Sequence, residues 1–212
     1  MMLTHANRNL CVIVGTALLL AACASNPVEP ELASTSQLEP LPRTLLQLND
    51  TQNFIDEVTG DKVIWTVSAV DGDSITMIDQ KNCSWTSPGD VMQPSDTWEN
   101  CGSSEWATGG IDGAKIKGDI WPMQVGNKIT YSQYFYNSGG DRSGQRHSRK
   151  CAVKSMVSVA VGEQMMDAYR LDCTQDYGDK LNRVYWFAPE VGLVKRRTGS
   201  SAKPTEELVR VL

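Results

Sequence analysis

Residues 151–173 read CAVKSMVSVAVGEQMMDAYRLDC, and this stretch decides the fold class. Positions equally distant from Gly162 match in kind, Cys151 with Cys173 and Val153 with Leu171. In an antiparallel hairpin that turns at residues 161–163, such residues lie opposite one another on one face. The same symmetry pairs three further positions: Ser155 with Tyr169, Val157 with Asp167, and Val159 with Met165. The stretch therefore predicts a hairpin stapled by a Cys151–Cys173 disulfide.

The chain around this hairpin also has the pattern of β structure. Residues 62–70 and 74–79 are rich in β-branched and aromatic side chains and are separated by the turn Asp71-Gly72-Asp73. Residues 128–137, 181–188 and 193–197 are further short strands between turn residues. We expect an all-β fold, an antiparallel meander that forms a small barrel or a curved half-barrel.

Residues 82–118 form the least regular part of this region. They hold three tryptophans and two cysteines among Pro, Ser, Asp and Gly. Such a segment needs a staple to stay ordered, so we expect a Cys83–Cys101 disulfide and an irregular excursion over the sheet. We interpret Trp85, Trp98 and Trp106 as packing side chains first and as a ligand-binding loop second.

The N-terminus has the pattern of a bacterial lipoprotein signal. Arg8 precedes a short apolar run that ends in Leu20-Ala21-Ala22-Cys23. The run is too short to span a bilayer, which takes roughly 20 apolar residues, so it predicts a signal peptide over 1–22 and lipidation of Cys23. A general secretory site, which would leave a free thiol, is the alternative. Ala24 after the cysteine favours the outer membrane, with the domain facing the periplasm.

Composition divides the remaining chain into two parts. Residues 23–50 are rich in Pro, Glu, Ser and Thr and predict a flexible tether, and 51–212 predict a single β domain. Without Arg8, the mature chain has 25 acidic and 19 basic residues, a net charge of about -6. This acidity argues against nucleic acid as a partner.

The cysteine count favours disulfides over a metal site. Four cysteines remain after Cys11 leaves with the signal and Cys23 takes lipid. They allow three pairings, and an exported domain favours disulfides. No Cys-x-x-Cys exists and His147 is the only histidine of the mature chain, which disfavours zinc. We expect no metal and no cofactor.

Two groups of side chains are candidates for a binding site. A concave face would present aromatic side chains to an amphiphile: Trp65, Tyr131, Phe135, Tyr169 and Trp186. Two basic clusters are interpreted as solvated strand ends first and as a site for an anionic envelope polymer second: Arg146, Arg149 and Lys150, and Lys195, Arg196 and Arg197. We expect no catalytic residues, because the polar stretch around His147 predicts an exposed histidine without a catalytic role, and no nucleophile elbow exists.

Several motifs resemble those of an uncharacterised family of proteobacterial envelope proteins. These are Trp121-Pro122-Met123, Val125-Gly126, the two later cysteines, and residues 185–197, which read YWFAPEVGLVKRR. The family carries a Trp-Pro-Leu, paired cysteines and a "WYxPExGxxVRR" ending. The resemblance covers residues 60–212 and implies a half-barrel-like envelope domain with no established activity.

Together these features predict an outer-membrane lipoprotein whose non-catalytic β domain binds an envelope protein or polymer. A carrier or chaperone for a lipid or other amphiphile is the second hypothesis, and a glycan hydrolase is the third. A large apolar cavity would favour the carrier, and a filled interior with an exposed patch would favour the partner-binding module.

Overall fold

The computed structural model describes residues 32–34, 37–88, 92–176 and 182–212. The signal peptide and Cys23 lie outside these residues. The described chain is all-β and contains no helix. Its strands are β1 (Leu32–Ala33), β2 (Thr51–Asp56), β3 (Lys62–Asp71), β4 (Ser74–Asp79), β5 (Ser84–Ser87), β6 (Thr97–Glu99), β7 (Gly109–Asp119), β8 (Lys128–Asn137), β9 (His147–Val161), β10 (Gln164–Gln175), β11 (Arg183–Ala188), β12 (Gly192–Gly199) and β13 (Pro204–Arg210).

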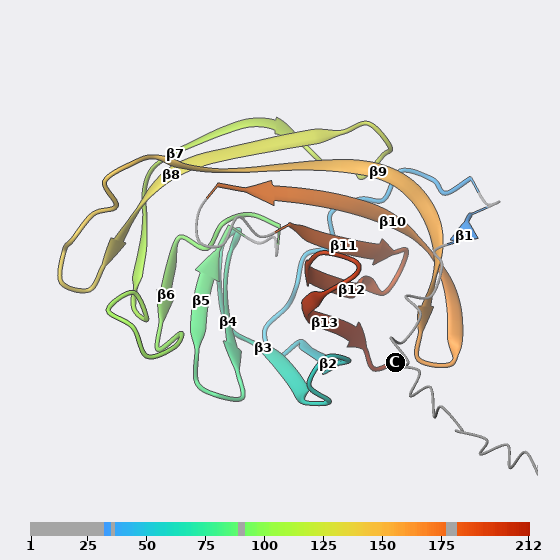
Figure 1. Ribbon diagram of the computed structural model, residues 1–212, viewed down its shortest axis with the longest axis horizontal. Helices are drawn as coiled ribbons and strands as arrows, with labels where there is room; N and C mark the ends of the chain where they lie inside the picture. The colour runs from blue at the N-terminus through green and yellow to red at the C-terminus, as the bar shows by residue number, and fades with distance from the viewer. Residues whose placement is uncertain (1–31, 35–36, 89–91, 177–181) are drawn as a thin grey trace, which may run out of the picture.

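Strands β2 to β13 form a closed antiparallel barrel. Each strand pairs with its sequence neighbours, β13 pairs with β2, and β1 adds to the outer part of β9 (Figure 1). The expected meander is confirmed, and it closes into a barrel. No helix in the described part of the chain is long and apolar enough to cross a membrane.

Both predicted disulfides are present in the barrel wall. Cys83 and Cys101 join the segments beside β5 and β6, and Cys151 faces Cys173 across β9 and β10. The stretch 82–118, expected as an irregular excursion, contains β5, β6 and most of β7. These strands complete the wall, and their tryptophans face the interior.

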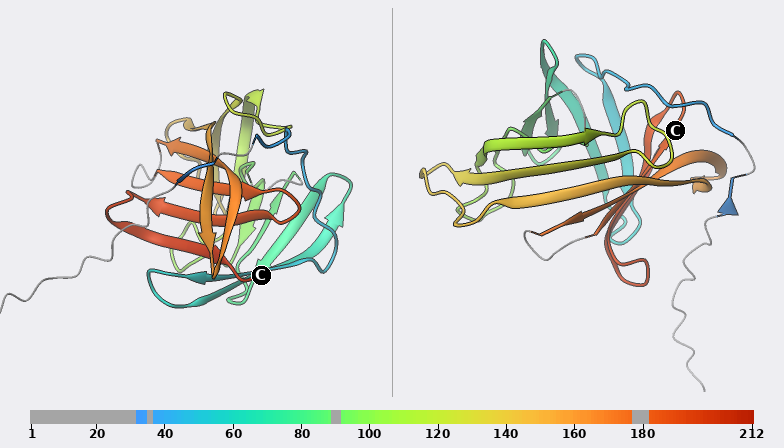
Figure 2. Two further views of the ribbon diagram at one scale, coloured as in Figure 1. Left: turned by 90° about the vertical axis from the view of Figure 1, so that its right-hand side faces the viewer. Right: turned by 90° about the horizontal axis from the view of Figure 1, so that it is seen from above.

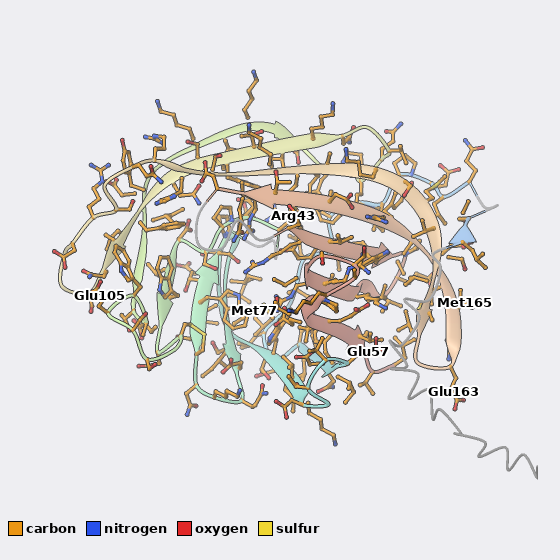
Figure 3. All side chains as sticks on the ribbon, in the orientation of Figure 1. Arg43, Glu57, Met77, Glu105, Glu163 and Met165 are labelled. Carbon is orange, nitrogen blue, oxygen red and sulfur yellow. A yellow bond between two sulfur atoms is a disulfide. The ribbon has the colours of Figure 1, made fainter. Side chains whose placement is uncertain are left out.

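One end of the barrel is filled by an apolar core. Side chains from the wall, such as Phe54, Met77 and Leu171, meet a plug from segments outside the strands. The plug consists of four fully or largely buried residues: Leu41, Met92, Ile120 and Met123. Figure 3 shows Met77 directed into the barrel. The core therefore closes this end and leaves the other end for a site.

Residues 37–50, expected to belong to the flexible tether, lie against the barrel. Leu41 exchanges two backbone hydrogen bonds with Met123, at 3.0 and 2.6 Å. The Tyr169 hydroxyl donates to the Leu38 carbonyl at 3.0 Å, and Arg43 donates to the Pro88 carbonyl at 2.6 Å. The folded domain therefore begins before the expected boundary at residue 51, because apolar side chains of this segment complete the core.

The outer part of the β9–β10 hairpin bends away from the wall and crosses the outside of β11, β12 and β13 (Figure 2). A second apolar cluster lies between the two layers and contains Val157, Val159, Ala168, Val184 and Trp186. Figure 3 shows Glu163 and Met165 at the tip of this hairpin. The hairpin thus belongs to the barrel at its base and to an outer layer at its tip.

A β-bulge in β9 causes this change of face. Beyond the bulge, the observed register differs from the predicted one. The expected pairs Cys151–Cys173 and Val153–Leu171 are present, but Lys154 is an extra residue between them and the next pair. Beyond it, Ser155 pairs with Arg170, Val157 with Ala168 and Val159 with Met166, so the three predicted pairs there are wrong. An extra residue moves every later side chain to the opposite face.

Candidate functional site

A cavity of about 960 Å³ lies inside the barrel at the end opposite the plug. Its rim is formed by the start of β3, the turn between β4 and β5, and the first residues of β9 and β11. The exposed residues Gln80 and Lys81 belong to its lining, so the cavity reaches the surface there. This volume is in the upper part of the range for small-molecule sites, roughly 300–1,000 Å³.

One side of the cavity is an aromatic wall, which we define as Trp65, Trp85, Trp98 and Phe135. The rings contact one another edge to face, with centroids 5.7 Å apart for Trp65 and Trp85 and 5.9 Å apart for Trp98 and Phe135. Strand alternation explains the arrangement, because Trp85 and Trp98 are register partners on β5 and β6. The Trp98 indole N–H donates to the Trp106 carbonyl at 2.8 Å, which fixes its ring.

The opposite side is a basic wall, which we define as Arg149, Arg183 and Arg196 from β9, β11 and β12. Arg149 is only 7% exposed. The Arg196 guanidinium lies 4.7 Å from the centre of the Trp65 ring, so the two walls meet there. The cavity is therefore amphipathic, with flat apolar surfaces facing fixed positive charges.

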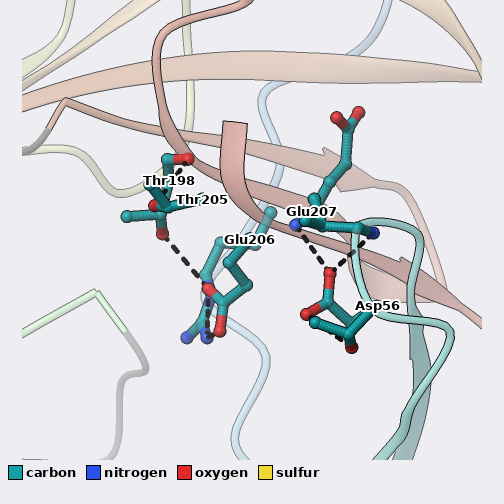
Figure 4. A network of polar contacts seen from close by, with 8 residues as sticks. Asp56, Thr198, Thr205, Glu206 and Glu207 are labelled. Carbon is teal, nitrogen blue, oxygen red and sulfur yellow. Dashed lines mark hydrogen bonds and ion pairs between the residues drawn. The ribbon is translucent and has the colours of Figure 1, made fainter. Parts of the chain in front are cut away.

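One carboxylate balances part of the basic wall. Glu206 accepts two hydrogen bonds from the Arg196 Nη2 atom, at 2.8 and 2.9 Å, and one from the Thr198 hydroxyl at 3.1 Å (Figure 4). Asp79, the other carboxylate of the lining, accepts the backbone N–H groups of Lys81 and Cys83 at 2.7 and 3.0 Å. The nearby Asp56 has a different function: it accepts the Glu207 backbone N–H at 3.0 Å and ties β13 to β2 (Figure 4).

Tyr185 reports the electrostatic field of the basic wall. Its side chain is 3% exposed and lines the cavity, and burial alone would raise the pKa of its hydroxyl. The positive charges of Arg149, Arg183 and Arg196, with a hydrogen bond from Arg183, outweigh burial, so the pKa of Tyr185 is lowered. The positive field therefore stabilises a phenolate at this position, and it favours any other anion there as well.

Some polar atoms of the lining are buried without a hydrogen-bond partner. Among the described residues, this holds for both amide atoms of Gln133 and for the Nε atom of Arg183. Gln133 is only 1% exposed and lines the cavity. An unpaired buried polar group costs about 1–3 kcal/mol, so a ligand that pairs these atoms recovers part of that cost.

His147 also lines the cavity, although we expected it to be exposed. Its ring stacks on Phe135 with a centroid distance of 5.2 Å, and its Nδ1 atom is 3.6 Å from the Asp176 carboxylate. The pKa of Asp176 is lowered, since hydrogen bonds from Ser148 and the charge of His147 outweigh desolvation. No cluster of three His, Cys, Asp or Glu side chains that could hold a metal occurs in the described ranges.

Two of the five residues predicted to face a ligand line the cavity, namely Trp65 and Phe135. Tyr131 and Tyr169 instead belong to the filled core. Trp186 lies on the outside of β11, in the second cluster, because alternation places Tyr185 and Phe187 inward. Its predicted ligand-facing position is therefore wrong.

The basic clusters expected as surface patches divide between the cavity and the outside. Arg149 and Arg196 line the cavity, whereas Arg146 donates to the carbonyls of Gly113 and Ser132 at 2.7 and 2.8 Å. The outward residues lie elsewhere: Lys150 is exposed, Lys195 pairs with Glu207 at 2.7 Å, and Arg197 lies 5.2 Å from the Trp186 ring. Sequence reasoning missed Arg183, although its spacing of two from Tyr185 puts both on one strand face.

No protein-family model matches the chain, and no curated protein matches it. Among solved structures, the chain is similar to that of the hypothetical lipoprotein YmcC from Escherichia coli, with a TM-score of 0.43 and 8% sequence identity. The alignment covers 83% of this chain and 90% of the YmcC chain.

Proposed function

We propose that this domain is a non-catalytic carrier that holds a small amphiphile in the barrel cavity. The observation that supports the proposal is the open cavity of about 960 Å³, lined by the aromatic wall on one side and the basic wall on the other. Pockets that bury most of a small ligand combine apolar surfaces with a few placed polar groups. A filled barrel would instead have favoured a partner-binding module.

The positions of the basic residues also support the carrier over recognition of an envelope polymer. Arg149 and Arg196 face the interior, where an extended polymer has little access, and Lys195 is engaged by Glu207 at 2.7 Å. These residues therefore form no continuous outer surface.

The setting that we propose is the outer membrane, with Cys23 lipidated and the domain in the periplasm. Two disulfides in a small domain suit an oxidising compartment outside the cytoplasm. The apolar run before Cys23 supports export. The anchor and the carrier function are independent proposals, and each has its own test.

The carrier is tested with the purified full chain, delipidated and then titrated with N-phenyl-1-naphthylamine, a neutral probe that fluoresces in apolar sites. We expect one saturable site and an affinity at least tenfold lower in Trp98→Ala, since that ring forms part of the aromatic wall. Trp186→Ala is the matched control, because that ring lies in the outer cluster. Near-ultraviolet circular dichroism checks that both variants are folded. Absence of saturable binding by the wild type would refute the carrier.

A further inference from the structure

The lining of the cavity carries more positive than negative side chains. Glu206 is bound by Arg196 and Thr198, with donor distances between 2.8 and 3.1 Å. Arg149 donates to the amide oxygen of Gln175 at 3.4 Å. Arg183 forms a hydrogen bond with the Tyr185 hydroxyl. Four basic residues therefore line the cavity, Lys81, Arg149, Arg183 and Arg196, against the two carboxylates of Asp79 and Glu206.

Gln133 adds an independent observation in the same cavity. Its side chain is 99% buried and lines the cavity from β8, the strand that pairs with β9. In the described part of the chain both of its amide atoms lack a hydrogen-bond partner. An amide N–H₂ in this position is a donor for a ligand oxygen, and the Arg183 Nε is a second such donor.

We propose that the ligand is an anionic amphiphile whose carboxylate or phosphate is bound by Arg149, Arg183 and Gln133, while its apolar part lies against the aromatic wall. This inference rests on the proposed carrier function and names the chemistry of its ligand. The planar guanidinium groups match the oxygen pairs of carboxylates and phosphates. The lowered pKa of Tyr185 agrees with a field that stabilises negative charge at this place.

The arrangement selects for a molecule with both parts. An inorganic anion would pair with the arginines but leave the four rings of the aromatic wall uncovered. A neutral apolar molecule would cover those rings and leave the Gln133 amide and the Arg183 Nε atom unpaired. Only a molecule with a charged group at one end satisfies both walls at once.

The experiment compares three ligands with the same apolar chain, which are dodecanoate, dodecyl phosphate and dodecanol, and includes inorganic phosphate alone. Binding to the delipidated full chain is measured by calorimetry or by quenching of tryptophan fluorescence. We expect at least one of the two anions to bind tenfold or more tightly than dodecanol, and inorganic phosphate to bind weakly. Which anion binds more tightly distinguishes a fatty acid from a phosphorylated lipid as the source.

Two variants locate the charged group. Arg183→Gln should remove most of the preference for the anion while leaving dodecanol binding within twofold. Arg142→Gln is the matched control, because that arginine is 51% exposed and pairs with Asp112 on the surface at 2.9 Å. If Arg183→Gln does not fold, Gln133→Leu tests the same group without removing a charge and should weaken the anion more than dodecanol.

The outcomes separate this inference from the carrier. Equal binding of the anions and dodecanol by the wild type overturns the anionic ligand and leaves the carrier in place. No binding of any dodecyl compound overturns both. Inorganic phosphate binding as tightly as dodecyl phosphate overturns the amphiphile, because the aromatic wall would then contribute nothing.

Discussion

Replacing Gln133 by leucine should stabilise the unliganded domain. The side chain is 1% exposed, and neither amide atom has a hydrogen-bond partner among the described residues. Each unpaired buried polar atom costs about 1–3 kcal/mol, and leucine removes both while its slightly larger volume extends into the adjoining cavity of about 960 Å³. We expect the free energy of unfolding to rise by about 2 kcal/mol, which for a chain of this size raises Tm by about 4–8 °C.

The assay is urea denaturation under non-reducing conditions, followed by tryptophan fluorescence. A higher midpoint with an unchanged slope identifies a change in stability rather than in compactness. Gln80→Leu is the matched control, because the Gln80 amide is paired on both sides. Its oxygen accepts the Ile64 N–H at 2.9 Å, and its nitrogen donates to the Lys62 carbonyl at 2.8 Å.

The two substitutions should act in opposite directions. Gln80→Leu loses two hydrogen bonds and should lower the free energy of unfolding by about 1–2 kcal/mol. If Gln133→Leu also lowers it by about 1 kcal/mol or more, the amide is paired in solution, and the reasoning that makes it a ligand donor is wrong.

Four further predictions concern the Cys151–Cys173 disulfide, the outer layer, the electrostatic field in the cavity and the lipid anchor. Cys151→Ala with Cys173→Ala should lower the free energy of unfolding by about 3 kcal/mol, because the bond spans 22 residues; an unchanged urea midpoint would contradict this. Trp186→Ala should cost about 3–5 kcal/mol yet leave ligand affinity unchanged in the folded protein, and weaker binding would argue against its outward position. Titration of absorbance at 295 nm should show Tyr185 ionising below the usual pKa of 10.0, because the arginines outweigh burial. Since its pKa is lower when folded, its contribution to stability is full above 10.0 and is lost as the pH falls through the folded pKa; a titration with every tyrosine at or above 10.0 would exclude this. Finally, Cys23→Ala should release the protein from the membrane fraction, and continued sedimentation with membranes would count against lipidation.

Alternation of side chains predicts the all-β class of this chain, because strands such as β2, β4 and β8 alternate buried with more exposed positions. The turn at Gly162 and the facing of Cys151 and Cys173 follow from symmetry, and the structure has both. The second disulfide, Cys83–Cys101, was expected from the irregular composition around it. Barrel closure through β13 and β2 joins segments about 150 residues apart, and local patterns carry no information about such a pairing.

The errors in the predicted register of the central hairpin come from a β-bulge, which alternation does not predict. The extra residue Lys154 in β9 turns Val157 and Val159 outward, and Val194 has the same effect in β12. Trp186 packs in one apolar cluster with Val157 and Val159. Composition suggested an exposed histidine at 147, whereas Phe135 covers its ring through a pairing of β8 with β9.

The place where β1 joins the barrel has a consequence for how the proposed carrier would be loaded. β1 pairs with Val157 and Ser158, whereas the mouth of the cavity is formed by the first residues of the same strand, from His147. Val157 lies ten residues beyond His147, which is roughly 33 Å along the strand. Cys23 lies nine positions before Leu32 in the sequence, so the lipid anchor that we propose there would join the chain at the end of the barrel away from the cavity mouth. Exchange of the cargo would then take place on the aqueous side, away from the leaflet that carries the anchor.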